Sequence, residues 1–285
     1  MTIREALQFA IPLLERSKID SAFLDAESLL AHVLKQDRAF VLARGEYALL
    51  KEQEREYKDL IKKRSEHVPF AYLIGTKEFY GHEFAVNKYT LIPRPETELL
   101  VEATLAYLKK DESKKFSLLD VGTGSGCIII ALALHAKNLG KLMAIDRVKR
   151  ALDVAKQNAE KHELGEHILF KRYNMISLIK ERFDIIVANL PYLSPKEISE
   201  STQQNPELGW EPQIALLGGK DGLLFIRQLI SQTRKHLNPG GALFLEIGDM
   251  QAEEVKKIAE QELAPCEVEI KKDLCHRDRV VVIRT

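Results

Sequence analysis

The sequence has few of the features that mark secreted, metal-binding or membrane-embedded proteins. Its 285 residues include three cysteines, Cys127, Cys266 and Cys275, whose odd number and wide spacing predict neither a disulfide framework nor a metal-binding pair. No apolar run approaches the roughly 20 residues that a membrane helix needs. Charged side chains near the amino terminus argue against a secretory signal, so we expect a cytoplasmic protein without membrane contact.

The sequence also lacks an excess of charge of either sign. Its 42 Lys plus Arg are balanced by 42 Asp plus Glu. Proteins that grip duplex nucleic acid usually carry a basic excess, because each phosphate contact uses a Lys or Arg. The balance argues against a direct nucleic-acid partner, although a local basic patch is compatible with it. The 45% hydrophobic and 29% charged residues are those of an ordinary globular protein, long enough for two domains.

Residues 1–75 show the spacing of amphipathic helices. Apolar residues recur at helical intervals over 3–14, where Pro12 is expected to kink the helix or start a new one. A second helix is expected from about Ser21, and a third over 51–64, where acidic and basic residues alternate as on a solvated surface. These patterns predict a small helical domain that carries no basic excess.

The hydrophobic period changes after this helical domain. Alternating apolar residues around Gly81 predict a β-hairpin linker over 76–90. The second domain is expected over 91–285, where two prolines precede a helix that opens at Glu96. Apolar strands then alternate with amphipathic helices, which predicts an α/β domain with a parallel sheet covered on both faces. The expected strands are 117–121, 141–146, 167–170, 183–189, 242–248 and 280–284.

A glycine-rich loop follows the first of these strands. Glycine is required where the chain turns sharply and a ligand approaches the backbone closely. The loop could be a plain tight turn or a dinucleotide site, but Cys127 occupies the third glycine position of the dinucleotide fingerprint. The spacing Asp-x-Gly-x-Gly-x-Gly resembles the first motif of class I methyltransferases, which faces S-adenosylmethionine. The predicted cofactor-binding residues of the loop are Gly122, Thr123, Gly124, Ser125 and Gly126.

Further cofactor contacts are expected where the next two strands end. Asp146 ends the second strand, at the edge where doubly wound sheets bind ligands, and its carboxylate could accept both ribose hydroxyls of an adenosyl group. It could instead cap the helix that begins near Val148. Asn174 and Met175 follow the third strand, where methyltransferases of this class contact the adenine.

The fourth strand ends in Asn189-Leu190-Pro191-Tyr192, which resembles the Asn-Pro-Pro-Tyr signature of methyltransferases acting on planar nitrogens. An amide nitrogen is a poor nucleophile because its lone pair is delocalised. The Asn189 side-chain oxygen and the Leu190 carbonyl could accept its two N–H groups, orient it and stabilise the charge that develops on nitrogen. Tyr192 could stack on the amide plane. These four residues are the predicted catalytic and substrate-binding site, with Asn189 also next to the cofactor.

Over nearly its whole length the sequence resembles the PrmC/HemK family of protein-glutamine methyltransferases. The resemblance lies in 69–86, LIPRPETE (91–98), 118–133, 183–192, EPQIALLGGKDGL (211–223) and 277–284. It implies a Rossmann-like methyltransferase domain with S-adenosylmethionine as cofactor. It also implies a helical domain that docks class I release factors, whose Gly-Gly-Gln glutamine is the methyl acceptor. We expect a monomer.

The sequence departs from the family pattern at three places. Leu190 stands for the first proline of the signature, Asn174-Met175 for Asp-Trp, and His276 for a glycine. Other residues have two open interpretations. Arg94, Glu96 and Glu98 could lie beside the catalytic mouth or serve as a helix cap and surface charges. Glu246 is similarly ambiguous, and Trp210 could cover the cleft or pack elsewhere.

Three rival functions remain open on the sequence. The Asn-x-Pro-Tyr chemistry also suits the amino group of adenine, but such an enzyme must flip a base and hold the flanking strand. The glycine loop could serve a nicotinamide-dependent oxidoreductase, although no hydride-transfer acid is evident. A catalytically inactive adaptor would retain the docking domain, and Leu190 slightly favours it.

Overall fold

The computed structural model describes residues 1–285, which form two compact units. The first unit comprises 1–75 together with 205–210, and the second comprises 76–204 together with 211–285. No helix combines the length and the apolar composition needed to cross a bilayer.

The first unit is a small helical bundle. Its helices are α1 (Ile3–Arg16), α2 (Ala22–Leu34), α3 (Arg38–Ala43), α4 (Lys51–Ser65) and α5 (Phe70–Ile74). The predicted helices are confirmed, and α1 runs through Pro12 as one element rather than restarting there. A capping box at Thr2 and Glu5 starts α1. Apolar side chains at helical spacing, among them Leu14, Leu30 and Ile61, are fully buried between the helices.

A buried arginine fixes the segment 205–210 to this bundle. Arg64 on α4 pairs with Asp25 on α2 and with Glu207, each at 2.6 Å. The indole N–H of Trp210 donates to the Glu66 carbonyl oxygen at 3.2 Å. Trp210 therefore belongs to the helical unit, where it stays 47% exposed.

The second unit is built on a seven-stranded sheet in the order β5-β4-β3-β6-β7-β9-β8. Its strands are β3 (Phe116–Val121), β4 (Leu139–Asp146), β5 (Ile168–Arg172), β6 (Phe183–Ala188), β7 (Leu237–Glu246), β8 (Glu267–Lys272) and β9 (Asp278–Arg284). The first five strands of that order are parallel, whereas β9 pairs antiparallel with both neighbours.

Two details of the predicted sheet were wrong. The sheet was expected to be parallel throughout, but β9 returns antiparallel, because a short turn joins it to β8 instead of a crossover helix. Strand β8 was missed. Four of the six residues in its sequence EVEIKK are charged, and it lies at the sheet edge, where one face is solvated, so it lacks the apolar run that marks the inner strands.

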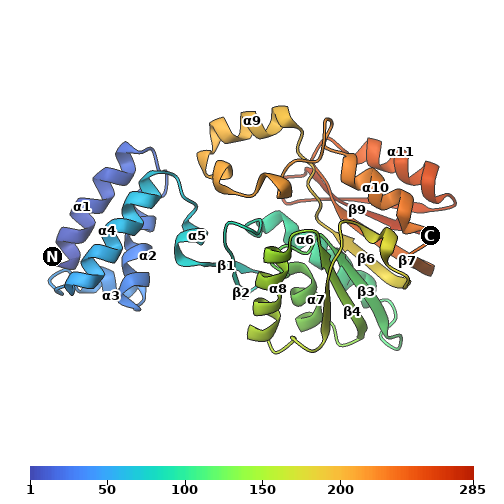
Figure 1. The fold of residues 1–285 in the computed structure, drawn as a ribbon, viewed down its shortest axis with the longest axis horizontal. Coiled ribbons are helices and arrows are strands. Elements are labelled where there is room, and N and C mark those ends of the chain that lie inside the picture. Colours follow the sequence, from blue (N-terminus) through green and yellow to red (C-terminus); the bar gives the residue numbers. More distant parts are fainter. The chain divides into compact units, whose positions relative to one another are not determined.

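Helices cover both faces of the sheet (Figure 1). Alternate residues of one strand enter different cores, as Leu118 and Leu119 of β3 show. One core packs against α6 and α7, and the other packs against α10 and α11. The helices of this unit are α6 (Glu98–Leu108), α7 (Cys127–His135), α8 (Lys149–Lys161), α9 (Pro195–Gln204), α10 (Leu224–Thr233) and α11 (Ala252–Leu263). Short 3₁₀ turns are η1 (Pro95–Thr97), η2 (Ile176–Leu178) and η4 (Gln213–Ala215), with η3 (Pro206–Trp210) in the helical unit.

The predicted β-hairpin is present as β1 (Thr76–Phe79) and β2 (His82–Ala85). Tyr80 and Gly81 both have positive φ, as a tight two-residue hairpin turn requires. The expected helix start at Glu96 is replaced by the 3₁₀ turn η1, and α6 begins two residues later at Glu98. Glu98 Oε1 accepts the Tyr80 N–H at 2.9 Å, so this carboxylate links the hairpin turn to α6.

Candidate cofactor and substrate site

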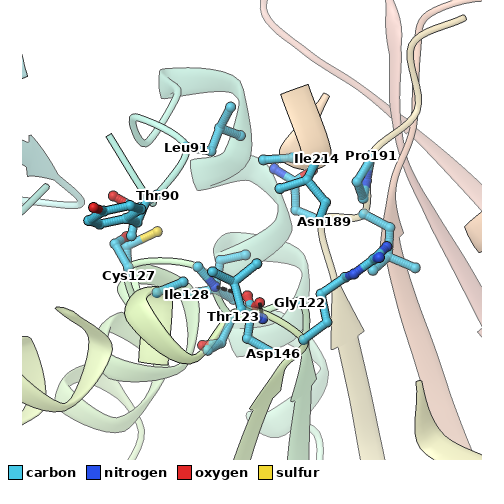
Figure 2. Close-up of a pocket in the computed structure, with 18 of the residues that line it drawn as sticks. Thr90, Leu91, Gly122, Thr123, Cys127, Ile128, Asp146, Asn189, Pro191 and Ile214 are labelled. Atoms are coloured by element: carbon cyan, nitrogen blue, oxygen red, sulfur yellow. Dashed lines mark hydrogen bonds between the residues drawn. The ribbon is translucent and has the colours of Figure 1, made fainter. Parts of the chain in front are cut away.

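A pocket lies at the carboxyl ends of β3, β4, β5 and β6 (Figure 2). The empty space inside it, including the open mouth, is about 940 Å³. Most of the predicted site residues meet here: Gly122, Thr123, Gly124, Ser125, Asp146, Asn174, Met175, Asn189, Leu190 and Pro191 all line the pocket. Gly126 and Tyr192 do not line the pocket.

The glycine loop has a backbone that only glycine adopts readily. Gly122, Gly124 and Gly126 have φ of 76°, 55° and 81°. A Cβ added at Gly122 would lie 3.0 Å from Leu190 Cδ2, so the loop after β3 and the turn after β6 touch at this point. A Cβ at Gly126 would lie 3.2 Å from the Ala155 Cβ. Gly126 therefore permits α7 to pack against α8 and does not face the pocket.

Asp120 supports the loop from the protein interior. It is completely buried, and the Thr123 hydroxyl donates to its Oδ2 at 2.6 Å, while Oδ1 has no hydrogen-bond partner. Burial raises the pKa of Asp120 to about 7. The first residue of the Asp-x-Gly-x-Gly-x-Gly motif thus shapes the loop and is not exposed to a ligand.

Asp146 both caps the start of α8 and lines the pocket. Its Oδ2 accepts the Gly124 N–H at 3.0 Å, and its Oδ1 accepts the Val148 N–H at 2.8 Å, just before α8 begins at Lys149. Burial raises the pKa of this carboxyl, while the backbone N–H groups hold it down. The carboxylate orders the turn into α8 and also lines the pocket.

A buried asparagine that the sequence analysis missed ties the loop to the hairpin. Asn158 on α8 donates to the carbonyl oxygens of Ser125 and Ala85, at 2.8 and 3.0 Å, and accepts the Ala85 N–H at 2.7 Å. Its hydrogen bonds are satisfied within the fold, so its effect on the pocket is to hold the glycine loop in place. An asparagine inside an amphipathic helix pattern carries no local signal of such a role.

These residues fit S-adenosylmethionine, the cofactor that the sequence predicts. A Cβ added at Gly122 would collide with the Leu190 side chain, so this position favours glycine. The glycine backbone, which has no side chain, can then lie close to a ligand. Asp146 stands where a carboxylate can accept ribose hydroxyls, and Met175 and Phe225 supply apolar lining for a flat ring. The pocket thus combines the backbone of the glycine loop, one carboxylate and apolar surface, which suits a zwitterionic amino acid joined to a nucleoside.

The turn after β6 places the two predicted acceptors at the pocket. Asn189 donates through Nδ2 to the Thr97 hydroxyl oxygen at 3.1 Å, which leaves its side-chain oxygen for a ligand. Leu190 is 6% exposed and packs in the apolar core, with its Cδ2 against Gly122. The leucine found at the first proline position therefore fills space against the glycine loop, and its backbone carbonyl is retained.

Two glycines of the EPQIALLGGKDGL segment pack directly against the backbone of this turn. A Cβ at Gly218 would lie 2.5 Å from the Pro191 carbonyl oxygen, and one at Gly222 would lie 2.2 Å from the Tyr192 carbonyl oxygen. Gly218 also donates its N–H to the Leu193 carbonyl oxygen at 2.8 Å. The glycines of this segment are required because two backbones meet there.

Arg94 and Glu211 join the proline-rich entry to the same segment. Glu211 is buried, accepts the Ile92 N–H at 3.1 Å and pairs with the Arg94 guanidinium. Arg94 lines the pocket, in agreement with the interpretation that it lies beside the catalytic mouth. Glu96 and Glu98 do not line it, and Glu98 serves the hairpin instead.

The position of His276 explains why a glycine is expected there. His276 has φ of 60°, in the left-handed region, within the tight turn that joins β8 to β9. Asp273 accepts the N–H groups of Cys275 and Arg277 on its side-chain oxygen, at 2.9 and 3.0 Å, and thereby fixes the turn. The histidine occupies a position that favours glycine for backbone reasons and has no contact with the pocket.

Two family models match the chain. The model described as the PrmC N-terminal domain covers residues 5–75, and a model described as a methyltransferase domain covers 112–277, more than half of the sequence. The second match agrees with the sheet and the glycine loop described above.

Curated relatives match along the full length. A release factor glutamine methyltransferase from Clostridium acetobutylicum is 37% identical over 285 residues, with 99% of this chain and 98% of the relative covered. One of the same name from Clostridium botulinum is 36% identical, with 100% and 99% covered.

A solved structure shares the fold at low sequence identity. The hMettl16 catalytic domain in complex with MAT2A 3'UTR hairpin 1 is 14% identical, has a TM-score of 0.58 and covers 90% of each chain. This likeness supports the class I methyltransferase architecture alone.

Proposed function

The chain belongs to the release factor glutamine methyltransferase family, and from that premise we propose that it methylates the glutamine of the Gly-Gly-Gln motif in class I peptide-chain release factors. The methyl donor is S-adenosylmethionine, and the acceptor is the side-chain amide nitrogen. The observation that carries the proposal is that Asn189, Leu190 and Pro191 of the turn after β6 line one pocket together with the glycine loop.

The proposed chemistry rests on the acceptors of this turn. The Asn189 side-chain oxygen and the Leu190 carbonyl oxygen accept the two N–H groups of the glutamine amide. They hold its nitrogen in line with the methyl group and stabilise the positive charge that grows on it. The methylated nitrogen is strongly acidic and releases its proton to water, so the mechanism requires no dedicated base.

The cofactor is proposed to lie along the glycine loop. When bound, it supplies an electrophilic methyl group on a sulfonium centre. Gly122, Thr123, Gly124 and Ser125 hold its amino-acid part, Asp146 accepts its ribose hydroxyls, and Asn174 with Met175 contacts the adenine.

The partner is proposed to be a release factor docked on residues 1–75, with the enzyme acting as a cytoplasmic monomer. Residues 5–75 match the PrmC N-terminal domain, and residues 1–75 carry equal numbers of basic and acidic side chains, 12 of each, so nothing in them favours a nucleic acid. Methylation of the amino group of adenine remains the second candidate, because the same acceptors suit that nitrogen.

The first experiment transfers labelled methyl groups from S-adenosylmethionine to a purified class I release factor. Peptide mass spectrometry should find one methyl group on the Gly-Gly-Gln glutamine and none after that glutamine is replaced. Label on RNA or DNA, and none on the release factor, would refute the proposal in favour of the adenine reaction.

The second experiment tests the acceptor directly. Replacement Asn189→Ala should lower kcat by at least about a thousandfold, because both the positioning and the electrostatic effect of its oxygen are lost. The dissociation constant of S-adenosylmethionine, measured by calorimetry, should stay within about threefold. Normal turnover by this variant would refute the assigned mechanism.

A further inference from the structure

Asn158 is a fully buried asparagine of α8 whose side chain joins two segments that lie far apart in the sequence. It donates to the Ser125 carbonyl oxygen at 2.8 Å and to the Ala85 carbonyl oxygen at 3.0 Å, and it accepts the Ala85 N–H at 2.7 Å. Because carbonyl oxygens only accept and N–H groups only donate, these partners fix the orientation of the Asn158 amide. One side chain thus holds the last residue of the hairpin and a residue of the glycine loop at the same time.

The hairpin is docked along α8 by further contacts. Glu83 of β2 pairs with Lys161 at 2.5 Å, and His162 Nε2 lies 3.0 Å from the Glu83 carbonyl oxygen. The Asn158 amide bonds to both polar groups of the Ala85 backbone, as a residue of a neighbouring strand would. The hairpin therefore follows the position of α8.

The chain runs from the hairpin directly into the wall of the pocket. Residues 89–91 line the pocket, whereas residues 76–86 do not, and only a short turn separates the two segments. In the first turn of α8, the Arg150 guanidinium lies 4.7 Å from the centroid of the Tyr89 ring and donates to its hydroxyl oxygen. Helix α8 thus holds this wall on both sides of the turn, through Asn158 before it and through Arg150 after it.

We propose that Asn158 is a positioning residue that couples the β-hairpin to the glycine loop of the cofactor site. Binding of S-adenosylmethionine to the loop then stiffens the hairpin. A loosened hairpin weakens binding of the cofactor by the same factor, because coupling between two sites is reciprocal. The inference rests on the proposed function, since it assumes that the cofactor lies along the glycine loop. It gives the hairpin, which does not line the pocket, a measurable effect on cofactor affinity.

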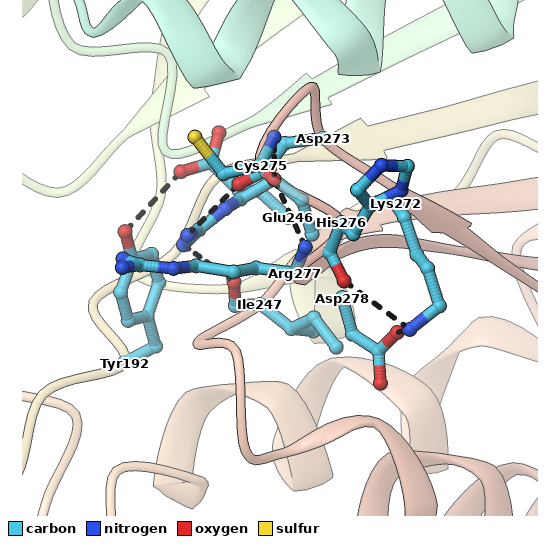
Figure 3. A network of polar contacts seen from close by, with 10 residues as sticks. Tyr192, Glu246, Ile247, Lys272, Asp273, Cys275, His276, Arg277 and Asp278 are labelled. Atoms are coloured by element: carbon cyan, nitrogen blue, oxygen red, sulfur yellow. Dashed lines mark hydrogen bonds and ion pairs between the residues drawn. The ribbon is translucent and has the colours of Figure 1, made fainter.

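A different set of long-range contacts supports the turn after β6. The Tyr192 hydroxyl donates to Oε1 of the buried Glu246 at 3.3 Å, and Figure 3 shows the two side chains facing each other. Asn189 of the same turn donates to the Thr97 hydroxyl oxygen. Because these contacts do not involve Asn158, loss of the Asn158 hydrogen bonds should change cofactor affinity and leave kcat at saturating cofactor nearly unchanged.

The first test measures hydrogen exchange of the hairpin amides in the full-length protein, with and without saturating S-adenosylmethionine. We expect the cofactor to slow exchange over residues 79–85 by about fivefold or more, which is a typical strength of coupling between sites. None of these residues lines the pocket, so direct shielding by the cofactor does not account for such protection. Unchanged exchange in the wild-type protein would overturn the inference.

The second test replaces the coupling residue. Asn158→Leu keeps the approximate shape of the side chain and removes all three hydrogen bonds. It should weaken S-adenosylmethionine binding, measured by calorimetry, about tenfold and abolish the protection of the hairpin by the cofactor, while kcat at saturating cofactor stays within about threefold. Asn158→Ala leaves space for water beside the freed carbonyl oxygens, should lose less affinity, and carries the test if Asn158→Leu does not fold.

Asn138→Leu is the matched control for the loss of a carboxamide. Asn138 also donates to two carbonyl oxygens, those of Leu108 at 2.9 Å and Asp111 at 3.2 Å, but it lies just before β4, at the opposite end of that strand from the pocket. This variant should lower Tm, yet keep cofactor affinity within about twofold and retain the protection of the hairpin. An equal loss of cofactor affinity in both leucine variants would mean that Asn158 acts through general stability and would overturn the inference.

The measurements separate this inference from the proposed function. Cofactor binding with protection of the hairpin, but without methyl transfer to a release factor, would refute the proposed function and support the coupling. Normal methyl transfer by the wild type, together with unchanged cofactor affinity in the Asn158 variants, would overturn the coupling and leave the proposed function standing.

Discussion

The two halves of the pocket obtain their shape in different ways. The loop after β3 is shaped by its own residues, since three glycines adopt positive φ and Asp120 accepts a hydrogen bond from Thr123 three residues away. The turn after β6 is shaped from a distance. It is held by Gly218 and Gly222 from another segment and by the Asn189–Thr97 hydrogen bond, which joins residues 92 positions apart. The conformation of the cofactor half is therefore encoded mainly by its own residues, with added hydrogen bonds to Asp146 and Asn158, whereas the conformation of the substrate half depends on tertiary contacts alone.

The largest expected effect comes from disturbing the distant support of the substrate half. Replacement Gly222→Ala places a Cβ 2.2 Å from the Tyr192 carbonyl oxygen at a φ of 77°, so the backbone of the turn must move. Because a shift of about 1 Å can cost about a hundredfold, we expect kcat to fall by about that factor. S-adenosylmethionine affinity, measured by calorimetry, should stay within about threefold.

Gly81→Ala is the matched control for this change. Gly81 has a similar φ of 74°, but an added Cβ there would meet nothing within 4 Å. The control variant carries the backbone strain without the collision and should retain turnover. An equal loss in both variants would show that strain, and not displacement of the turn, is responsible.

A smaller effect is expected from the opposite half. Replacement Gly122→Ala puts a Cβ 3.0 Å from Leu190 Cδ2 at a φ of 76°, and the leucine side chain can yield by a few tenths of an ångström. The loop would still be forced from its preferred backbone, at a cost of order 1–3 kcal/mol. We expect S-adenosylmethionine to bind about tenfold more weakly, while kcat at saturating cofactor falls less than threefold.

Gly240→Ala, with φ of 72° and open space around it, is the control for the cofactor half. It should leave cofactor binding unchanged. If Gly122→Ala instead lowered kcat and spared the binding of the cofactor, the division of the pocket into two halves would be wrong.

The difference between local and distant support explains which site residues the sequence could predict. The glycine loop, Asp146 and the Asn189–Tyr192 turn were recognised because each lies directly after an apolar strand, and parallel strands bring their carboxyl ends to one edge. The contributions of Thr97 and Asn158 were not predicted, and Glu246 was left with two interpretations. Their partners lie far away in the chain, and no local pattern states which backbone atom a buried side chain will meet.

The errors in the predicted fold have a similar origin. Strand β8 was missed because a half-exposed edge strand lacks an apolar run, and the orientation of β9 followed from that omission. The family pattern has a glycine at position 276, which the sequence alone did not explain, and the structure gives the reason, since the turn has positive φ there although the residue is histidine. Backbone requirements were thus legible in the sequence, while edge pairing and long-range polar contacts were not.

The smallest expected effect is on the pH dependence of stability, and it distinguishes two similar buried carboxyl groups, Asp120 and Glu246. Burial raises the pKa of both Asp120 and Glu246 to about 7, but the first supports the cofactor half and the second the substrate half. In the unfolded chain both titrate near pH 4, so between about pH 4 and 7 the folded state holds protons that the unfolded state has lost. The free energy of unfolding should therefore fall as pH rises through this window and become level above it, with a slope of at most about 1.4 kcal/mol per pH unit for each group.

Replacement Asp120→Asn should remove about half of that slope and leave kcat within about twofold, because Asp120 does not line the pocket. Urea unfolding at several pH values between 4.5 and 7.5 measures the slope. Asp184 is the control, because although burial raises the pKa of this carboxyl, hydrogen bonds from Ser117, Lys114 and Asn238 lower it to about 2, outside the window. Asp184→Asn should change stability by a similar amount at every pH. A large loss of turnover in Asp120→Asn would mean that the cofactor half is coupled to the reacting groups, and the two buried carboxyls would then serve one function rather than two.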